Sequence, residues 1–337
     1  MDRRGFFKAA GAAAATAAAA CPAQARGNKQ LSPDAVGLLF DSTLCVGCKA
    51  CVAACKQAND MPPEVHTEDA LWDTPLDISG KTLNVIKVYK HGSFNRKDQV
   101  ENGFAFSKKS CLHCVDASCV SACPVSAMKK DPVTGLVSYN VDACIGCRYC
   151  VAACPFGVPR FTYDSPTPKI SKCQLCQHRW PEGKYAACAE VCPTGATLFG
   201  KVSDIKAEIA RRKALEPGTP TVFPRGRLGG PDQSYPGVAS KYVDHVYGER
   251  EVGGTQMLML SGVPFELLGY PTLPDTSFAS KSETLQHTLY GGLIAPIAFL
   301  GGLTWIAKRN VKAEDAAQAA SAAPAPEAPT EGGPHGR

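Results

Sequence analysis

The sequence lacks the patterns that mark a self-contained enzyme. Its 337 residues show no glycine-rich loop for a phosphate, no nucleophile beside a general base and no open metal site. Basic residues form no stripe with interleaved aromatics, and the formal net charge is only +5, so nucleic-acid binding is not indicated. Charged residues make up 20% and hydrophobic residues 45%, as in an ordinary globular protein, and the length allows two domains.

Cysteine is what the chain has in excess. Sixteen of its 17 cysteines fall into four runs of four, and the first and third runs have the pattern C-x2-C-x2-C-x3-C. That spacing is typical of thiolates that ligate [4Fe–4S] clusters. Four runs supply ligands for four cubane clusters with none left over, which indicates a path for electrons. The runs span residues 45–55, 111–123, 144–154 and 173–192.

Zinc and disulfides are the alternatives to clusters. Zinc sites usually pair two C-x2-C units across a longer gap, and disulfide frameworks belong mostly to short chains. A proline follows the last cysteine of runs two, three and four, as suits the first turn of a helix, whereas the first run has Lys56 there. Because all sixteen positions are cysteine, nothing indicates a three-iron or Rieske-type centre.

Runs two and three together resemble one bacterial two-cluster ferredoxin, and runs one and four would form a second one around it. In such ferredoxins the fourth cysteine of a run ligates the other cluster. The resemblance therefore implies crossed ligand sets, which keep neighbouring clusters close. The sets are Cys45, Cys48, Cys51 and Cys192 for cluster 1; Cys55, Cys173, Cys176 and Cys188 for cluster 2; Cys111, Cys114, Cys119 and Cys154 for cluster 3; and Cys123, Cys144, Cys147 and Cys150 for cluster 4.

Residues 1–25 have the order of a twin-arginine signal peptide. Arg3 and Arg4 come first, an alanine-rich stretch follows, and Ala23-Gln24-Ala25 forms a small-x-small cleavage site. An accidental arginine pair before a low-complexity helix is the alternative. Cys21 lies in this segment and is excluded from the ligands. Lipidation of Cys21 is the alternative to cleavage after Ala25. This route exports folded proteins, so clusters built in the cytoplasm could reach the periplasm intact.

The segment from Leu289 to Ala307 contains no ionisable side chain. As a helix it would span about 28 Å, close to the ~30 Å hydrocarbon core of a bilayer. Lys308, Arg309 and Lys312 follow, which predicts a transmembrane helix with its C-terminal end in the cytoplasm and the cluster domain on the periplasmic face. A buried core helix is the alternative. Residues 308–337 are expected to be a disordered cytoplasmic tail.

Small residues recur every three or four positions in this segment. Such a stripe would let another transmembrane helix approach closely, although glycine is also simply tolerated in lipid. The stripe consists of Gly291, Ala295, Ala298 and Gly302.

The remaining local signals are few. Residues 56–110 are expected to be a polar insertion with one strand, Thr82–Tyr89, and the Gly- and Pro-rich residues 216–237 a loop. Ser203 and Asp204 would cap a helix that ends at Leu215, and Thr255–Leu260 would be a buried strand. We therefore expect an α+β fold over residues 26–287, with two ferredoxin-like two-cluster modules, followed by the transmembrane helix.

Four stretches besides the cluster runs carry a family resemblance. They are Asp41–Cys48, Cys111–Asp116, Gly253–Gln256 and, at the membrane entry, Gln286–Tyr290. With them the chain resembles the ferredoxin-type iron–sulfur subunit of hydrogenase-2-class membrane-bound [NiFe] hydrogenases. The resemblance implies a non-catalytic subunit that passes electrons through four [4Fe–4S] clusters. It would take them from a hydrogenase small subunit and deliver them to an integral membrane partner that reacts with quinone.

Two other interpretations remain. The cluster runs are shared with β-subunits of formate dehydrogenase and other molybdenum enzymes, although the membrane-entry stretch favours hydrogenase. A structural metal-binding protein, for example a zinc protein, is the third class.

Two histidines lie near these features. His113 lies between two ligands and could hydrogen-bond a cluster, although a packed or solvated loop residue is the commoner role. His287 could face a quinone path or, more simply, sit at the membrane interface.

Overall fold

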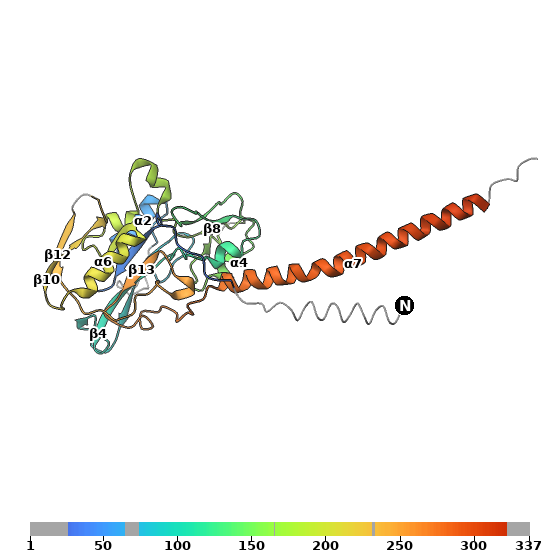
Figure 1. The fold of residues 1–337 in the computed structure, drawn as a ribbon. Coiled ribbons are helices and arrows are strands. Elements are labelled where there is room, and N and C mark those ends of the chain that lie inside the picture. Colours follow the sequence, from blue (N-terminus) through green and yellow to red (C-terminus); the bar gives the residue numbers. More distant parts are fainter. Residues whose placement is uncertain (1–25, 65–73, 165, 231–232, 322–337) are drawn as a thin grey trace, which may run out of the picture. The chain divides into compact units, whose positions relative to one another are not determined.

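The computed structural model describes residues 26–64, 74–164, 166–230 and 233–321. The predicted signal peptide, with Cys21, and residues 322–337 of the predicted tail lie outside the described residues. The described chain up to Glu283 forms one compact unit, and the chain from Thr284 belongs to a second unit. The cluster runs all lie in the first unit, which Figure 1 shows with its elements labelled.

The central sheet has four strands in the order β11-β9-β1-β13. Strand β1 is an apolar run because both of its faces are covered. Leu38 and Phe40 enter the main core, while Leu39 packs with Ile205 and Ile209 of α6 on the other face. Alternate residues of a strand point to opposite faces, so one sequence run serves two cores. The elements are β1 (Val36–Asp41), β9 (Thr197–Lys201), β11 (Gly226–Arg227), β13 (Met257–Leu260) and α6 (Val202–Ala214).

The insertion contributes a second sheet, in the order β2-β4-β3. One strand, Thr82–Tyr89, was expected here. Strand β2 (Val85–Lys90) overlaps it and ends one residue later, but β3 (Arg96–Lys97) and β4 (Gly103–Lys109) were missed. Strand β4 has polar and charged residues on both faces, so its sequence has no simple apolar alternation. Its pairing with β2 and its contacts with the core, rather than its own pattern, explain its formation.

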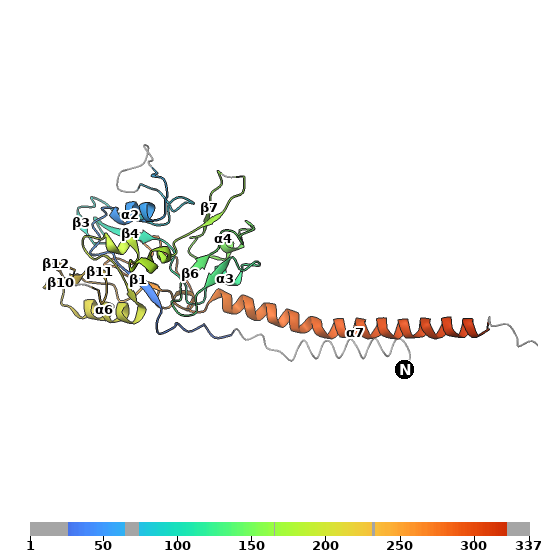
Figure 2. The same cartoon turned by 90° about the horizontal axis from the view of Figure 1, so that it is seen from above.

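Runs two and three surround two small hairpins. Strands β5 (Met128–Lys130) and β6 (Val137–Tyr139) pair across the turn predicted at 131–135, and β7 (Arg160–Phe161) pairs with β8 (Ile170–Ser171). Short helices carry the later cysteines of each run, and Figure 2 shows α3 and α4 beside the β6 region. These helices are α2 (Ala50–Ala58), α3 (Ser118–Ser121), α4 (Tyr149–Ala153) and α5 (Ala187–Glu190), while 3-10 helices span Gln177–Glu182 and Glu251–Gly253.

Two expectations about residues 201–238 were wrong in detail. The segment 216–237 is not a plain loop, because β10 (Pro220–Pro224) pairs antiparallel with β12 (Ser234–Val238) and β11 joins the central sheet. Its prolines and glycines obscured strands that are short and partly exposed. Helix α6 occurs as predicted, but its N-cap is Lys201 and no side chain caps it; Ser203 donates a hydrogen bond to Asp204 instead.

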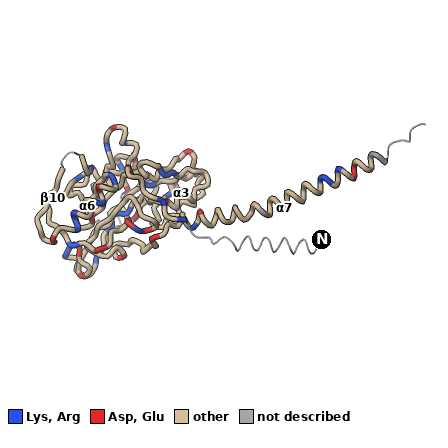
Figure 3. The backbone as a smooth tube through the Cα atoms, viewed as in Figure 1, with Lys and Arg blue, Asp and Glu red and all other residues tan. Residues whose placement is uncertain are grey.

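Helix α7 runs from Phe278 to Ser321 and contains the predicted apolar segment. Among the described residues it is the one helix long and apolar enough to cross a membrane, judged by length and composition. Figure 3 shows a long stretch of α7 without charged residues, followed by Lys and Arg. The helix continues past Ala307, so the tail expected to be disordered from residue 308 begins as helix.

Candidate iron–sulfur sites

Runs one and three share one backbone turn. Gly47 and Gly146 both have φ of +70°, and the next residue but one, Lys49 or Arg148, has φ of +58° or +65°. Two left-handed residues so close together curl the chain tightly around the second cysteine, which lies between them. The helix that starts after the curl bears the third cysteine in both runs; in run one it also bears Cys55, whereas Cys154 is the C-cap of α4. The spacing therefore produces one loop shape twice, as the repeated motif predicts.

The missing proline in run one has a structural consequence. In runs two, three and four the helix ends at or before the residue ahead of the Cys–Pro pair, because a residue before proline disfavours helix. In run one Lys56 allows α2 to continue to Ala58. The buried Lys56 ammonium donates hydrogen bonds to the carbonyls of Pro62 and Lys81 and pairs with Glu64 at 3.3 Å. Lys56 thus ties the first run to the insertion.

Runs one and four come together. Helix α2 packs against α5, and Cys45, Cys51, Cys188 and Cys192 belong to one buried core cluster. A small cavity is lined by all four predicted ligands of cluster 1, namely Cys45, Cys48, Cys51 and Cys192, together with Phe40 and Ile86. Cys192 is far from the other three in sequence, so only the fold brings it to their side.

The predicted set of cluster 2 is also brought into proximity. Burial raises the pKa of Cys55 to about 12, and the nearby thiols of Cys188 and Cys176 raise it further. The pKa of Cys173 is likewise raised by burial and then by Cys55. Thiols of runs one and four therefore lie close enough together for one to raise the pKa of another.

Runs two and three show the same relation. Helix α3 packs against α4. Burial raises the pKa of Cys119 to about 12, with contributions from Cys111 and Cys154, and raises that of Cys150 to about 11, with contributions from Cys144 and Cys123. Cys154 is thus grouped with run two and Cys123 with run three.

A few thiols of different sets also influence each other. Cys51 is near Cys188, Cys173 is near Cys111, and Cys119 is near Cys150. If the sets are numbered as above, these contacts join set 1 to set 2, set 2 to set 3, and set 3 to set 4. These proximities link the predicted sets in the order 1, 2, 3 and 4.

The chemistry of the donors fits iron–sulfur clusters. All sixteen described cysteines are free thiols. Among the described residues, no three His, Cys, Asp or Glu side chains converge as ligands of a single metal ion do. In a cubane each cysteine binds a different iron, so its ligands stand further apart. Buried thiols with raised pKa values remain protonated unless a cation replaces the proton, and cluster iron supplies that charge.

Buried or half-buried lysines accompany the thiols, and sequence reasoning missed them. The ammonium of Lys172 donates to the carbonyls of Val137 and Cys173, and that of Lys130 to the carbonyls of Cys114 and Gly135. Lys108 is fully buried. Ammonium groups are rarely buried without an anion, and four-thiolate clusters are anionic. Only the alternation of residues along a strand could have identified Lys108 as buried, and its strand, β4, was not predicted.

His113 is packed, as the commoner of its two expected roles requires. Its ring is buried, its φ is +50°, and Nδ1 accepts a hydrogen bond from the Val137 N–H at 3.2 Å. Burial, with Lys172 and Lys130 nearby, lowers its pKa well below the usual value, so the ring is neutral. The proton then sits on Nε2, which has no hydrogen-bond partner in the described chain. This Nε2–H lies beside run two and could donate a hydrogen bond to a sulfur of a cluster there.

Comparisons with known proteins also indicate iron–sulfur clusters. A family model described as a 4Fe-4S dicluster domain matches residues 103–202. Over 318 residues the chain is 46% identical to the hydrogenase-2 operon protein HybA of Escherichia coli O157:H7, a match that covers 93% of this chain and 96% of that protein. The chain belongs to the HybA family.

Formate dehydrogenase subunits are more distant relatives. The chain is 31% identical over 275 residues to the iron-sulfur subunit of the nitrate-inducible formate dehydrogenase of Escherichia coli K12, covering 79% of this chain and 83% of that subunit. It is 36% identical over 179 residues to the formate dehydrogenase-O iron-sulfur subunit, covering 53% of this chain and 57% of that one. With HybA as its family, the chain is an iron–sulfur electron-transfer protein with a ferredoxin-type domain, as its cysteine runs predicted.

Proposed function

We propose that this chain is a non-catalytic subunit that relays electrons through four [4Fe–4S] clusters, held by the four crossed sets given above in two ferredoxin-like modules. The observation that supports the proposal most strongly is the series of neighbouring thiols Cys51–Cys188, Cys173–Cys111 and Cys119–Cys150. The clusters supply one-electron transfer, and the chain supplies their spacing and insulation. A series of four sets gives a path with two ends.

Exposure distinguishes the ends from the middle. Cys48 of set 1 and Cys147 of set 4 are the exposed members of the sixteen, whereas sets 2 and 3 contain none. Next to them Val46 is 54% exposed and Ile145 is 65% exposed. An apolar residue and a ligand at the surface of each terminal set provide a short route to a redox partner, while the inner sets are shielded from solvent.

The end with sets 3 and 4 lies near the start of α7. A pocket within the first unit is lined by α3, α4 and the residues Phe278, Ala279 and Ser282. Arg26 donates to Asp116 in run two at 2.6 Å and to Glu283 at 2.7 Å, which ties these elements together. We infer that sets 3 and 4 form the exit towards the membrane and that set 1 receives electrons.

The partners follow from the family. HybA is named as a hydrogenase-2 operon protein, so the proposed donor is a hydrogenase small subunit and the acceptor an integral membrane protein that reacts with quinone. The apolar part of α7 would anchor the chain by a single span on the periplasmic face, with export by the twin-arginine route. A role in a formate dehydrogenase complex is the alternative, and the lower identity to those subunits disfavours it.

Iron analysis and EPR test the cluster count. The purified chain should contain about sixteen iron atoms and about sixteen labile sulfides, four of each per cubane. Zinc, or markedly less iron after anaerobic preparation, would contradict the proposal.

The anchor is tested by truncation. A chain that ends before Gln286 keeps every cysteine of the runs and loses the apolar segment. Hydrogen oxidation with a soluble dye should persist wherever the catalytic subunits assemble, whereas hydrogen-dependent quinone reduction should fall sharply. A chain that ends after Lys312 is the matched control, because it loses only the tail. Equal quinone-linked rates in the two truncated chains would show that the segment is dispensable.

A further inference from the structure

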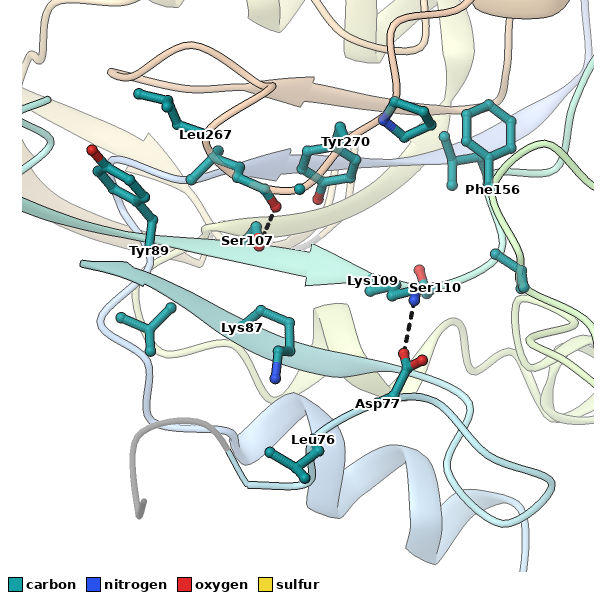
Figure 4. A pocket seen from close by; sticks show the side chains of 16 residues that line it. Leu76, Asp77, Lys87, Tyr89, Ser107, Lys109, Ser110, Phe156, Leu267 and Tyr270 are labelled. Carbon is teal, nitrogen blue, oxygen red and sulfur yellow. Dashed lines mark hydrogen bonds and ion pairs between the residues drawn. The ribbon is translucent and has the colours of Figure 1, made fainter. Parts of the chain in front are cut away.

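Neighbouring lysines on β4 have opposite environments. Lys109 projects into a pocket of about 430 Å³, where it forms an ion pair with Asp77 at 2.8 Å, as Figure 4 shows. Lys108 points to the other face of the strand and is completely buried. Its register partner on β2 is Ile86, which lines the cavity of set 1. Alternation along one strand thus places one ammonium in a partly exposed pocket and the other beside the thiols.

One hydroxyl group holds the Lys108 backbone in place, and a second hydroxyl holds its ammonium. Its N–H donates to the Tyr270 hydroxyl at 3.2 Å, and the same hydroxyl donates to the Lys108 carbonyl at 2.8 Å. At the far end of the side chain, Nζ donates to Oγ1 of Thr197 at 3.2 Å. The Thr197 N–H in turn lies 3.4 Å from the sulfur of Cys192, a predicted ligand of cluster 1. The ammonium therefore has a fixed position.

The surroundings of this ammonium contain thiols where a carboxylate would be expected. In the described part of the chain no Asp or Glu lies within ion-pair distance of Lys108. Its ionisable neighbours are Cys188 of set 2 and Cys51 and Cys192 of set 1. Lys108 is thus positioned between the two sets.

We propose that Lys108 is a positioning charge that makes clusters 1 and 2 easier to reduce. A reduced cluster carries one more negative charge than an oxidised one. A buried cation nearby stabilises the reduced form more than the oxidised form, and it does so strongly because water does not screen it. In the relay proposed above, on which this inference rests, Lys108 would favour entry of electrons at the first two clusters.

Redox titration followed by EPR on the purified full-length protein tests this role. In Lys108→Met the side chain keeps a similar length and loses its charge. We expect at least a tenfold fall in the reduced-to-oxidised ratio of two clusters at a fixed potential, equal to about 59 mV for a one-electron couple. The two affected signals should be those disturbed in Cys48→Ser and Cys176→Ser, which mark clusters 1 and 2.

Two variants separate charge from packing. Lys108→Arg keeps the charge, so its ratios should stay close to those of the unsubstituted protein. Lys109→Met removes a half-exposed lysine, paired with Asp77, from the adjacent position and should shift no cluster, because solvent and that carboxylate screen its charge. Unchanged ratios in Lys108→Met, or equal shifts in Lys108→Arg and Lys108→Met, would overturn the proposal.

Failure to assemble clusters is also informative. If Lys108→Met holds fewer clusters but Lys108→Arg holds the full number, the charge is needed and the proposal stands in a stronger form. If both lose clusters equally, the site requires the shape of lysine, and the proposal is wrong. An unsubstituted protein with fewer than four clusters would contradict the proposed function, whereas four clusters with no effect of Lys108→Met would contradict this inference alone.

Discussion

Arg212 on α6 donates a hydrogen bond from Nη1 to Oδ2 of Asp41 at 2.7 Å, and neither side chain is exposed to solvent. Asp41 ends β1 four residues before the first ligand, and Tyr242 and Thr43 also donate to its carboxylate. The guanidinium lies over the ring of Phe223, with 5.1 Å from Cζ to the ring centroid. This buried pair therefore joins α6 to the segment that leads into the first cysteine run.

Arg212→Met should destabilise the fold by about 3–5 kcal/mol, because it leaves a buried carboxylate without its cation. Its neighbour Arg211 is 39% exposed, and its partner Glu208 is buried but keeps Arg212 as a second cation, so Arg211→Met should cost at most about 1 kcal/mol. Chemical denaturation followed by circular dichroism measures both free energies of unfolding. Equal losses in the two variants would contradict the importance of the buried pair.

Glu208 gives this region a pH dependence. Burial opposes its ionisation, but hydrogen bonds and charge from Arg211 and Arg212 hold its pKa below the usual range. The carboxylate therefore contributes stability above pH of about 4.3, the unfolded value, and this contribution is lost as the pH falls through the lower folded value. Glu208→Gln should be less stable than the unsubstituted protein at pH 7, and the difference should shrink below pH of about 4.3. A difference that grows in acid would contradict this sign.

Gly47 and Gly146 occupy the same motif position but differ in their surroundings. A Cβ at Gly47 would lie 2.4 Å from two ring atoms of Phe106, whereas one at Gly146 would meet nothing closer than the Pro168 carbonyl oxygen at 3.6 Å. Both have φ of +70°, so alanine costs both about 1–2 kcal/mol of backbone strain. Gly47→Ala should therefore lose a cluster that Gly146→Ala retains.

Iron content per chain and EPR measure this difference. Phe106 is buried and packs edge-on to Phe104, so its ring cannot easily move aside. The double variant Gly47→Ala/Phe106→Leu should regain iron relative to Gly47→Ala. Equal iron in Gly47→Ala and Gly146→Ala would show that the close approach of Phe106 is not limiting.

Crossed ligation makes Cys150 and Cys154 ligands of different clusters although both belong to run three. Cys154→Ser should damage the cluster held by Cys111, Cys114 and Cys119, because the thiol of Cys154 lies near Cys111. Cys150→Ser should damage the other cluster of the pair. EPR of the two variants distinguishes them, and loss of the same signal in both would refute the crossed scheme.

The arginine pair should be needed for export of the folded, cluster-loaded chain. Replacing both Arg3 and Arg4 with Lys should leave the precursor in the cytoplasm with its clusters assembled, since the substitution lies outside the cluster domain. Fractionation with immunoblotting and iron analysis measures this outcome. Processed protein in the periplasm of that variant would exclude the twin-arginine route.

Much of the candidate site can be predicted from the sequence alone, because its motifs are short continuous stretches of the chain. The spacing of cysteines within each run determines the loop shape, so the iron–sulfur family was predicted correctly from motifs. The apolar segment was also visible, since length and the absence of charge are properties of a continuous stretch. Helix α6 and strand β13 were predicted from their apolar positions. The N-cap of α6 was predicted wrongly, because no side chain caps this helix.

Only the tertiary structure decided what depends on distant partners. It brings Cys192 to the cavity of run one, makes Lys108 a buried charge and Lys109 a half-exposed one, and leaves Nε2 of His113 without a partner in the described chain. Burial and charge proximity are properties of the whole fold rather than of a short window of sequence. Strand β4 carries Lys108, yet its own residues alternate too irregularly to predict a strand. The motifs thus determined the kind of cofactor, while packing decided the electrostatic environment in which each cluster would work.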